Sequence, residues 1–351
     1  MPNGSIKKQN SETKIEKIEK KIEKPVKRYI RFLRIDEERQ RKVIEEIKER
    51  AEPNFDFILL TVFSTIIVSF GLLIDNVAVV IGGMLIAPLI WPILALAIAI
   101  IKGNIRLIKK SFFTILKFTL AIFLVAFLIA LLTPYLGESH EVLLRTKPTL
   151  FELFIALAAG FIGAFAVAHP KLSAALAGVV AAVALVPPLA VMGILFAQGS
   201  FVLATGAALL YFTNLIAIAL TSIILFLMVG IKFPKRETCK DVAVSNISWF
   251  IIFLVIIVIP LSLVMKDVLQ ENKERSIIKE VIESYTINTK VINLTVDDKG
   301  EVIVIEATLQ SPYELTAWHV NRLSDILIER LGASVNLTMK IVPTYEVGRG
   351  L

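Results

Sequence analysis

An apolar stretch over residues 82–94, with the sequence GGMLIAPLIWPIL, contains residues that break helices. Gly82 and Gly83 begin it, and Pro88 and Pro92 follow. Proline has no backbone N–H and displaces the carbonyl one turn earlier in a helix. Hydrocarbon offers those backbone groups no water, so they need contact with protein or a wet cavity with something bound in it. The pattern predicts a broken membrane helix that binds a small solute or ion.

A second apolar stretch repeats this combination with Gly178, Pro187 and Pro188. Paired broken helices are typical of transporters, which bind their substrates where the breaks meet near the middle of the bilayer. A structural alternative stays open, because glycine and proline are frequent in membrane helices and glycine permits close contact between helices. We therefore expect either a solute pathway or kinked, tightly packed helices at these positions.

Glu152 and Asn214 are the polar side chains best placed to act within the apolar segments. An ionisable group inside a bilayer is costly and often belongs to a proton relay, so Glu152 is a candidate for proton coupling. The alternative for Glu152 is an interfacial carboxylate at a helix start. Asn214 is expected either to bond to a neighbouring helix or to line a substrate path.

The sequence offers no recognisable constellation for catalysis. Cys239 is the single cysteine, which excludes a disulfide framework or a Cys-rich metal site within one chain. His140, His169 and His319 have no metal-ligand spacing. Ser, His and Asp, or two carboxylates, do not occur at the spacing of a known catalytic motif. We therefore expect no enzyme, no catalytic residues, no cofactor and no bound metal.

Apolar stretches must position these residues. The chain has 351 residues, of which 56% are hydrophobic, and its mean hydropathy of +0.73 is outside the range expected for a soluble domain. A bilayer core needs about 20 mostly apolar residues per helix. Stretches of this kind lie at residues 57–74, 77–101, 112–136, 150–168, 172–197, 201–229 and 247–265. We expect a multi-pass protein of the lipid bilayer with about seven spans.

The first six spans predict an internal repeat, with repeat A at residues 55–136 and repeat B at residues 150–230. The following positions align at an offset of 96 residues: Gly82 with Gly178, Pro92 with Pro188, and Gly103 with Gly199. Each repeat has three spans, an odd number, so the second copy would enter the membrane from the opposite side. The predicted fold class is an all-α membrane domain with a 3+3 inverted repeat, in which helices 2 and 5 are broken.

Charge sets the expected orientation in the cell membrane. Lys and Arg are concentrated before span one and after spans two and six, and the opposite loops carry no basic excess. This predicts a cytoplasmic N-terminus and an extracytoplasmic C-terminus. Residues 1–54 form a basic, charged segment that is expected to be helical and to lie near the anionic inner leaflet. We expect no nucleic-acid partner, because the basic residues alternate with acids and lack exposed aromatics.

Residues 266–351 have the composition of a soluble domain, which the seventh span at residues 247–265 places outside the cell. A helical stretch comes first, and VINLTVDD and EVIVIEATLQ then alternate like strands. A second helical pattern and the strand VNLTMKIV complete the segment. The order helix, strand, strand, helix, strand predicts a small α+β domain with a role in binding or assembly.

Three stretches resemble a known family: IDNVAVVIGGMLIAPLIWPILALAIAIIKGN, HPKLSAALAGVVAAVALVPPLAV and the following YFTNLIAIAL. They resemble the prokaryotic membrane-protein family named domain of unknown function 389. The resemblance covers roughly residues 55–230. It implies a multi-pass membrane protein and supplies no established substrate or reaction.

Two functions remain as hypotheses. The first is a transporter or channel for a small solute or ion, with its site at the Gly- and Pro-broken helices near the bilayer midplane. The alternative is a non-transporting membrane sensor or assembly protein that acts through the C-terminal domain. Transport is favoured, because the alternative does not explain the repeat or the paired prolines. The small-residue stretch AALAGVVAA is also compatible with packing between subunits of a homo-oligomer.

Overall fold

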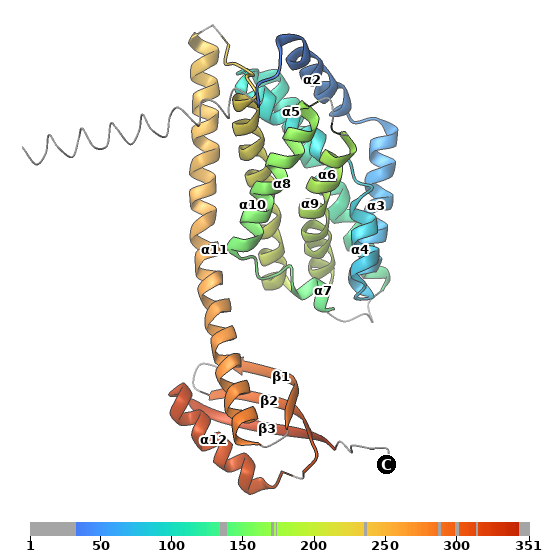
Figure 1. Ribbon diagram of the computed structural model, residues 1–351. Helices are drawn as coiled ribbons and strands as arrows, with labels where there is room; N and C mark the ends of the chain where they lie inside the picture. Colours follow the sequence, from blue (N-terminus) through green and yellow to red (C-terminus); the bar gives the residue numbers. More distant parts are fainter. Residues whose placement is uncertain are drawn as a thin grey trace, which may run out of the picture. The chain divides into compact units, whose positions relative to one another are not determined.

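The structure of the chain is a computed structural model, drawn in Figure 1. It describes residues 33–133, 139–169, 172, 174–234, 237–286, 289–298, 302–313 and 315–343. These residues form two compact units, one up to Ser262 and one from Leu263 onward, which are described separately. Residues 1–32 of the predicted basic segment lie outside the described residues.

Helices build the first unit. They are α2 (Glu37–Arg50), α3 (Phe55–Leu73), α4 (Val77–Met84), α5 (Ile90–Ile101), α6 (Ile105–Leu132), α7 (His140–Leu143), α8 (Leu150–Ala168), α9 (Ala174–Ala197) and α10 (Phe201–Met228). The long helix α11 (Glu237–Tyr285) begins in this unit and continues into the second. This largely helical architecture agrees with the predicted fold class.

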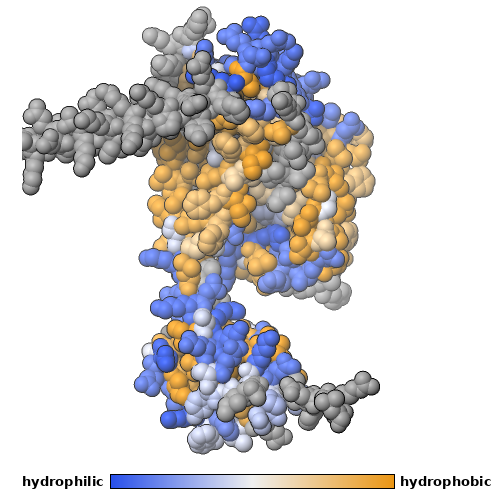
Figure 2. Space-filling view, viewed as in Figure 1, coloured by the Kyte–Doolittle hydropathy of each residue, from blue (hydrophilic) through white to orange (hydrophobic). Residues whose placement is uncertain are grey.

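Four of these helices, α3, α6, α8 and α10, are long and apolar enough to cross a membrane. Shorter apolar helical stretches at Ile90–Ile101 and Ala184–Ala197 fall within the second and fifth predicted spans, and one at Leu254–Lys266 overlaps the seventh. Figure 2 shows hydrophobic side chains across the middle of the first unit and hydrophilic side chains at its two ends. The structure therefore supports a membrane protein with at least four candidate spans, and the count of seven stays a prediction.

Asparagine side chains define where three of the apolar helices begin. Asn54 precedes α3, Asn76 precedes α4 and Asn104 precedes α6. Each side chain accepts a hydrogen bond from the backbone N–H three residues later, at 2.8, 3.2 and 3.1 Å respectively. The first N–H groups of a helix have no partner within the helix, so these caps satisfy donors that would otherwise lack one.

Several helix ends meet at a basic end of the first unit, defined here by Arg39, Lys102, Lys110 and Lys232. The Nζ atom of Lys102, just after α5, donates to the carbonyl of Lys232, just after α10, at 3.0 Å. Lys110 near the start of α6 pairs with Glu52, which precedes α3. Helices α3 and α6 therefore begin at the basic end, and α5 and α10 end there.

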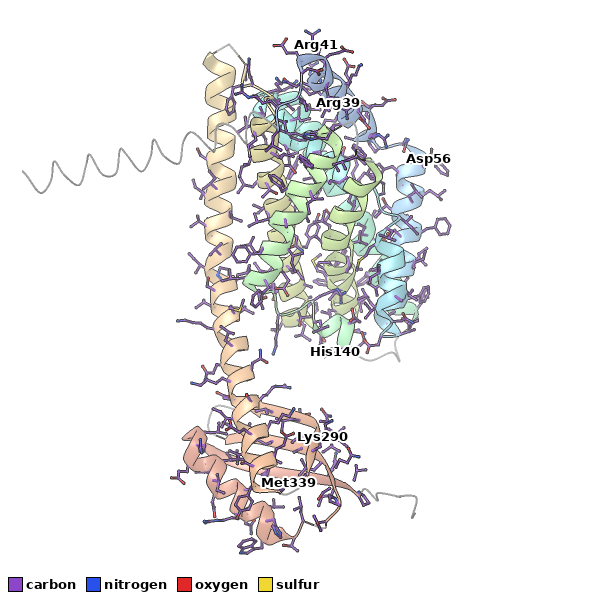
Figure 3. The ribbon with its side chains drawn as sticks, in the orientation of Figure 1. Arg39, Arg41, Asp56, His140, Lys290 and Met339 are labelled. Atoms are coloured by element: carbon purple, nitrogen blue, oxygen red, sulfur yellow. The ribbon has the colours of Figure 1, made fainter. Side chains whose placement is uncertain are left out.

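Helix α8 also ends at the basic end. Arg39 of α2 donates from Nη2 to the carbonyl of Val167 at 2.9 Å and from Nε to the carbonyl of Ala168 at 3.1 Å. The last carbonyls of a helix lack helical donors and attract a cation. At the opposite end, Ser139 donates to the carbonyl of Leu72 at 2.5 Å, and Figure 3 shows Arg39 and His140 at opposite ends of the unit. Helices α8 and α10 therefore run in the opposite direction to α3 and α6.

The second predicted span is divided. Helix α4 ends at Met84 and α5 begins at Ile90, so residues 85–89 interrupt the span where the sequence predicted a break. The predicted break in span five is wrong, because α9 is continuous through Pro187 and Pro188. Helix α11 also differs from the prediction, because it runs without interruption through the expected seventh span and the helix expected after it.

The second unit contains a small three-stranded sheet. Its strands are β1 (Lys290–Asp298), β2 (Val302–Ser311) and β3 (Ser334–Pro343), in the order β1-β2-β3, and α12 (Ala317–Leu331) connects the last two. Strands β1 and β2 are antiparallel, and β2 and β3 are parallel. Alternate residues of β2, including Ile305 and Leu309, form a buried core with Leu323 of α12 and Ile282 of α11. The predicted small C-terminal α+β fold is present.

Candidate functional site

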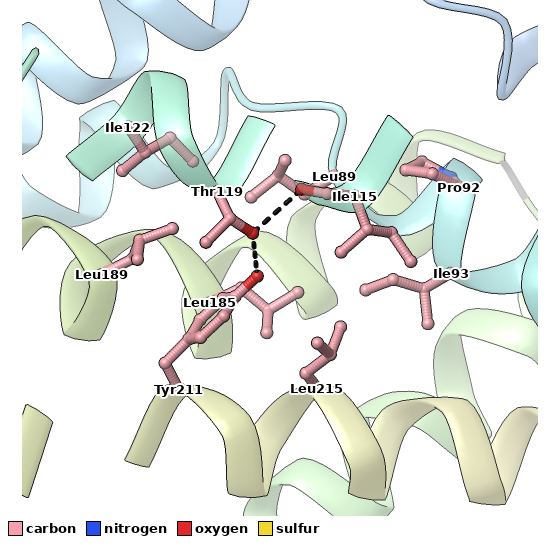
Figure 4. A pocket seen from close by; sticks show the side chains of 10 residues that line it. All are labelled: Leu89, Pro92, Ile93, Ile115, Thr119, Ile122, Leu185, Leu189, Tyr211 and Leu215. Atoms are coloured by element: carbon pink, nitrogen blue, oxygen red, sulfur yellow. Dashed lines mark hydrogen bonds between the residues drawn. The ribbon is translucent and has the colours of Figure 1, made fainter. Parts of the chain in front are cut away.

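A small pocket lies inside the first unit, where α5, α6, α9 and α10 meet (Figure 4). Its volume is about 10 Å³, which is the space of about one water-sized sphere. The lining residues are Leu89, Pro92, Ile93, Ile115, Thr119, Ile122, Leu185, Leu189, Tyr211 and Leu215. The pocket therefore adjoins both the interruption of the second span and the part of α9 that carries the two prolines.

The pocket is lined by corresponding residues of the two predicted repeats. Four pairs of lining residues are separated by the predicted offset of 96 residues: Leu89 and Leu185, Ile93 and Leu189, Ile115 and Tyr211, and Thr119 and Leu215. Most of the lining thus consists of matched positions. The sequence alignment at this offset also pairs Leu89 with Leu185, whereas Thr119, Leu189 and Leu215 were not singled out from the sequence.

The polar groups of the pocket are the hydroxyls of Thr119 and Tyr211, which form a hydrogen bond between α6 and α10. The Thr119 hydroxyl also donates to the carbonyl of Ile115 at 2.9 Å (Figure 4). A threonine hydroxyl has one proton, so the Tyr211 hydroxyl is the donor in the bond to Thr119. This bond links the two helices across the pocket.

Pro92 is the third residue of α5 and is buried in the pocket lining. The first N–H groups of a helix have no helical acceptor, so a proline this early costs no helical hydrogen bond. Pro88 is half-buried and lies in the interruption itself. The two prolines of predicted repeat A thus lie just before and just after the start of α5.

Asn214 explains why α9 remains a helix through its prolines. Pro188 has no N–H to donate to the carbonyl of Ala184, four residues earlier. The side-chain Nδ2 of Asn214, in α10, donates to that carbonyl at 2.7 Å. The corresponding position in predicted repeat A is Phe118 of α6, which has no such donor, and the second span is interrupted at residues 85–89. The sequence predicted a broken span five. Instead, a side-chain donor from α10 replaces the missing backbone donor, and α9 stays continuous.

Asn214 has a second polar atom whose hydrogen bonding is incomplete. Its Oδ1 is buried and has no hydrogen-bond partner among the residues that the structure describes. The whole residue is 5% exposed, and it lies at the middle of the 28-residue helix α10. Buried polar groups usually have a partner, so this oxygen marks Asn214 as a candidate ligand.

The predicted glycines have different surroundings. A Cβ on Gly83 would lie 2.7 Å from Cγ2 and 2.9 Å from the backbone N of Val68, whereas a Cβ on Gly82 would meet no atom within 4 Å. Gly83 therefore permits close contact between α4 and α3, and Gly82 does not serve packing. Gly178 lies in the part of α9 whose side-chain surroundings are outside the described residues.

Glu152 caps the start of α8. Its carboxylate accepts from the backbone N of Thr149 at 2.8 Å, and the Thr149 side chain accepts from the backbone N of Glu152, which completes a capping box; the Thr149 hydroxyl also donates to the carboxylate. Glu152 does not line the pocket described above. The geometry favours the interfacial role for Glu152, while its predicted place in an ion pathway stays a prediction.

A larger apolar groove adjoins the pocket. It has a volume of about 610 Å³, lies between α5, α6 and α10, and shares Thr119 and Tyr211 with the pocket. Lys109 is the charged residue of its lining, and Phe112 and Phe212 contribute aromatic walls. The Thr119–Tyr211 bond therefore lies where the inner pocket and the outer groove meet.

Comparison with known proteins agrees with the resemblance. Residues 84–220 match the family model described as a domain of unknown function (DUF389). The chain is 29% identical over 231 residues to the uncharacterized protein MJ0678 of Methanocaldococcus jannaschii, and the alignment covers 64% of this chain and 72% of that protein. The matched segment contains α5, α9 and Asn214. The family resemblance is thereby confirmed: residues 84–220 of this chain are similar to the domain of unknown function 389 family.

Proposed function

We propose that this protein is a membrane transporter or channel for a small solute or ion, with a pathway that passes the inner pocket. The observation that carries the proposal is the meeting of the interrupted second span and the proline-containing part of α9 at one pocket, lined by matched residues of both halves. Interrupted helices are costly in a bilayer and are tolerated where they are buried in protein or line a cavity.

An inverted repeat is part of this proposal. Helices α6 and α10 have 28 residues each and begin 96 residues apart, at Ile105 and Phe201. The turns before them contain Gly103 and Gly199, both with positive φ, at 60° and 78°. The two helices run in opposite directions between the ends of the unit. These features support two inverted copies of one three-span motif, an arrangement found in many secondary transporters.

The pathway is closed in this conformation. A pocket of about 10 Å³ holds no solute larger than about one water. Conduction therefore requires that α6 and α10 separate, which breaks the bond between Thr119 and Tyr211. Alternating access of this kind moves one half of the molecule against the other around a fixed site.

The basic end is proposed to face the cytoplasm. Arg39, Lys102, Lys110 and Lys232 define this end, whereas Asp75 and Glu141 lie near the opposite end, where the Glu141 backbone N donates to Asp75 at 2.8 Å. Cytoplasmic loops carry an excess of Lys and Arg, so this distribution favours the proposed orientation.

Flux from the purified chain in liposomes tests the proposal. The panel contains monovalent cations, small anions and a proton gradient, and empty liposomes are the control. Leu185→Cys places a thiol in the pocket, and Leu120→Cys places one on a 54% exposed position of α6, both with Cys239→Ser. A charged thiol reagent should block flux through the Leu185→Cys variant alone. Absence of flux across the panel, with folded protein, would reject the transporter.

A further inference from the structure

One side-chain oxygen of α10 and one backbone oxygen of α9, two helices that pack together, lack an ordinary donor. The Nδ2 of Asn214 donates to the carbonyl of Ala184, whereas its Oδ1 has no partner among the described residues. Pro187 likewise has no N–H to donate to the carbonyl of Val183, which is next to Ala184 in α9. The two adjacent prolines thus remove the helical N–H donors of two successive carbonyls. The side-chain amide of Asn214 donates to only one of these, the carbonyl of Ala184.

The interrupted second span brings further backbone oxygens to the same region. Residues 85–89 lie outside a helix, and Leu89 at their end lines the same pocket as Leu185 of α9. The carbonyls of Ala87 and Pro88 occupy the positions that correspond to Val183 and Ala184 at the offset of 96 residues. Carbonyls of unwound membrane helices are the groups that bind Na⁺ in transporters with inverted repeats.

The charge of the ligand follows from the charge of its surroundings. Helices α9 and α10 contain no Asp, Glu, Lys, Arg or His over Ala174–Ala197 and Phe201–Met228. Amide and carbonyl oxygens accept but do not donate, so they suit a cation better than an anion. Divalent cations such as Ca²⁺ and Mg²⁺ usually require carboxylates, so neutral oxygens favour an ion with one charge.

We propose that the Asn214 Oδ1 and the carbonyl of Val183 bind a small monovalent metal cation such as Na⁺, and that this ion is the transported or the coupling ion. The second half of the proposal rests on the proposed transport function. A buried water that donates to both oxygens is the competing occupant, because water also satisfies two acceptors. The N-terminus of α5 near the pocket makes an anion the second competitor.

Thermal unfolding of the full chain in detergent distinguishes these occupants. The melting temperature is measured in increasing NaCl, with choline chloride keeping the total salt constant, and again with sodium gluconate to remove chloride. Specific binding to the folded state predicts a saturable rise of the melting temperature with Na⁺. The rise should persist in gluconate, because the chloride anion is not the ligand.

Variants assign the rise to the two oxygens. Pro188→Ala gives the carbonyl of Ala184 a backbone N–H donor. Asn214→Leu can then be added to remove Oδ1, and the carbonyl of Ala184 still has a donor. This double variant should lose the Na⁺-dependent rise, whereas Pro188→Ala alone should keep it. Pro187→Ala, which returns a donor to Val183, should weaken it. Thr213→Val is the matched control, because the Thr213 hydroxyl donates to the carbonyl of Leu209 at 2.6 Å within α10, and this variant should keep the full rise.

Three results would overturn the cation site: no difference between Na⁺ and choline, a rise that follows chloride, or a rise that survives in the double variant. The liposome assay separates this proposal from the transport function. Flux without a Na⁺-dependent rise would reject the cation site and keep the transporter. A Na⁺-dependent rise without flux of any ion would keep the binding site and reject its role in transport.

Discussion

Asn214 shows how much one residue decides in this molecule. It lies on α10, but it donates the hydrogen bond that Pro188 cannot donate within α9. A buried acceptor that loses its donor costs about 1–3 kcal/mol. Asn214→Leu should therefore lower the free energy of unfolding by about that amount.

Pro188→Ala provides the check on this interpretation, since it gives the carbonyl of Ala184 a backbone donor. The double variant should lose less stability than the sum of the two single variants, as denaturant unfolding in detergent would measure. If the two losses simply add, Asn214 does not serve the Ala184 carbonyl.

Gly82 and Gly83 offer a second comparison at the same scale. A Cβ on Gly83 would press against the backbone of Val68 on α3, and one on Gly82 would enter open space. Overpacking typically costs about 1–3 kcal/mol, so Gly83→Ala should destabilise the protein and Gly82→Ala should not. Melting temperatures of the two variants measure this directly. Helix propensity alone favours alanine at both positions, so equal changes in the two variants would contradict the contact of Gly83 with α3.

At the scale of elements, Glu152 belongs to the start of α8. Glutamine also forms capping boxes, so Glu152→Gln should leave both stability and flux nearly unchanged. Thr149→Val removes the other half of the box and should cost about 1 kcal/mol. The pH dependence of flux is the decisive measurement. A pH dependence that disappears in Glu152→Gln would restore the role in proton coupling that the sequence suggested.

At the same scale, the hydrogen bond between Thr119 of α6 and Tyr211 of α10 is expected to act as a gate. Tyr211→Phe removes the donor to Thr119, and such a bond is worth about 0.5–1.5 kcal/mol. If separation of these helices limits transport, flux should rise by roughly two- to tenfold, which is that energy expressed as a rate. Thr114→Val on α6 is the control, because the Thr114 hydroxyl bonds to the carbonyl of Lys110 at 2.9 Å within its own helix. An equal rise in both variants would contradict the gate.

For the molecule as a whole, the division into two units separates the hypotheses. All residues of the pocket lie in the first unit, which extends to Ser262. Removal of residues 266–351 should therefore leave flux through the remaining chain measurable in liposomes. Complete loss of flux from a chain that still folds would favour the alternative, in which the C-terminal α+β domain carries the function.

Local chemistry is what the sequence by itself determined. The positions of the apolar stretches and the break before α5 follow from residues close together in the chain. The succession of helices and strands along the second unit follows in the same way from alternation and turns. The break was predicted correctly because a proline acts within one turn of its own position.

Only the tertiary structure decided what the second pair of prolines does. The donor that keeps α9 continuous is Asn214 of α10, which is 30 residues from the Ala184 carbonyl in the sequence, and no local sequence pattern predicts this contact. The same holds for Thr119 and Tyr211, which the fold brings together from helices 92 residues apart. A buried backbone group must find a partner, but the sequence does not say whether a neighbouring side chain or a bound ion provides it. In this protein, α10 provides one such partner at Ala184 through Asn214, whose own side-chain oxygen has no partner among the residues that the structure describes.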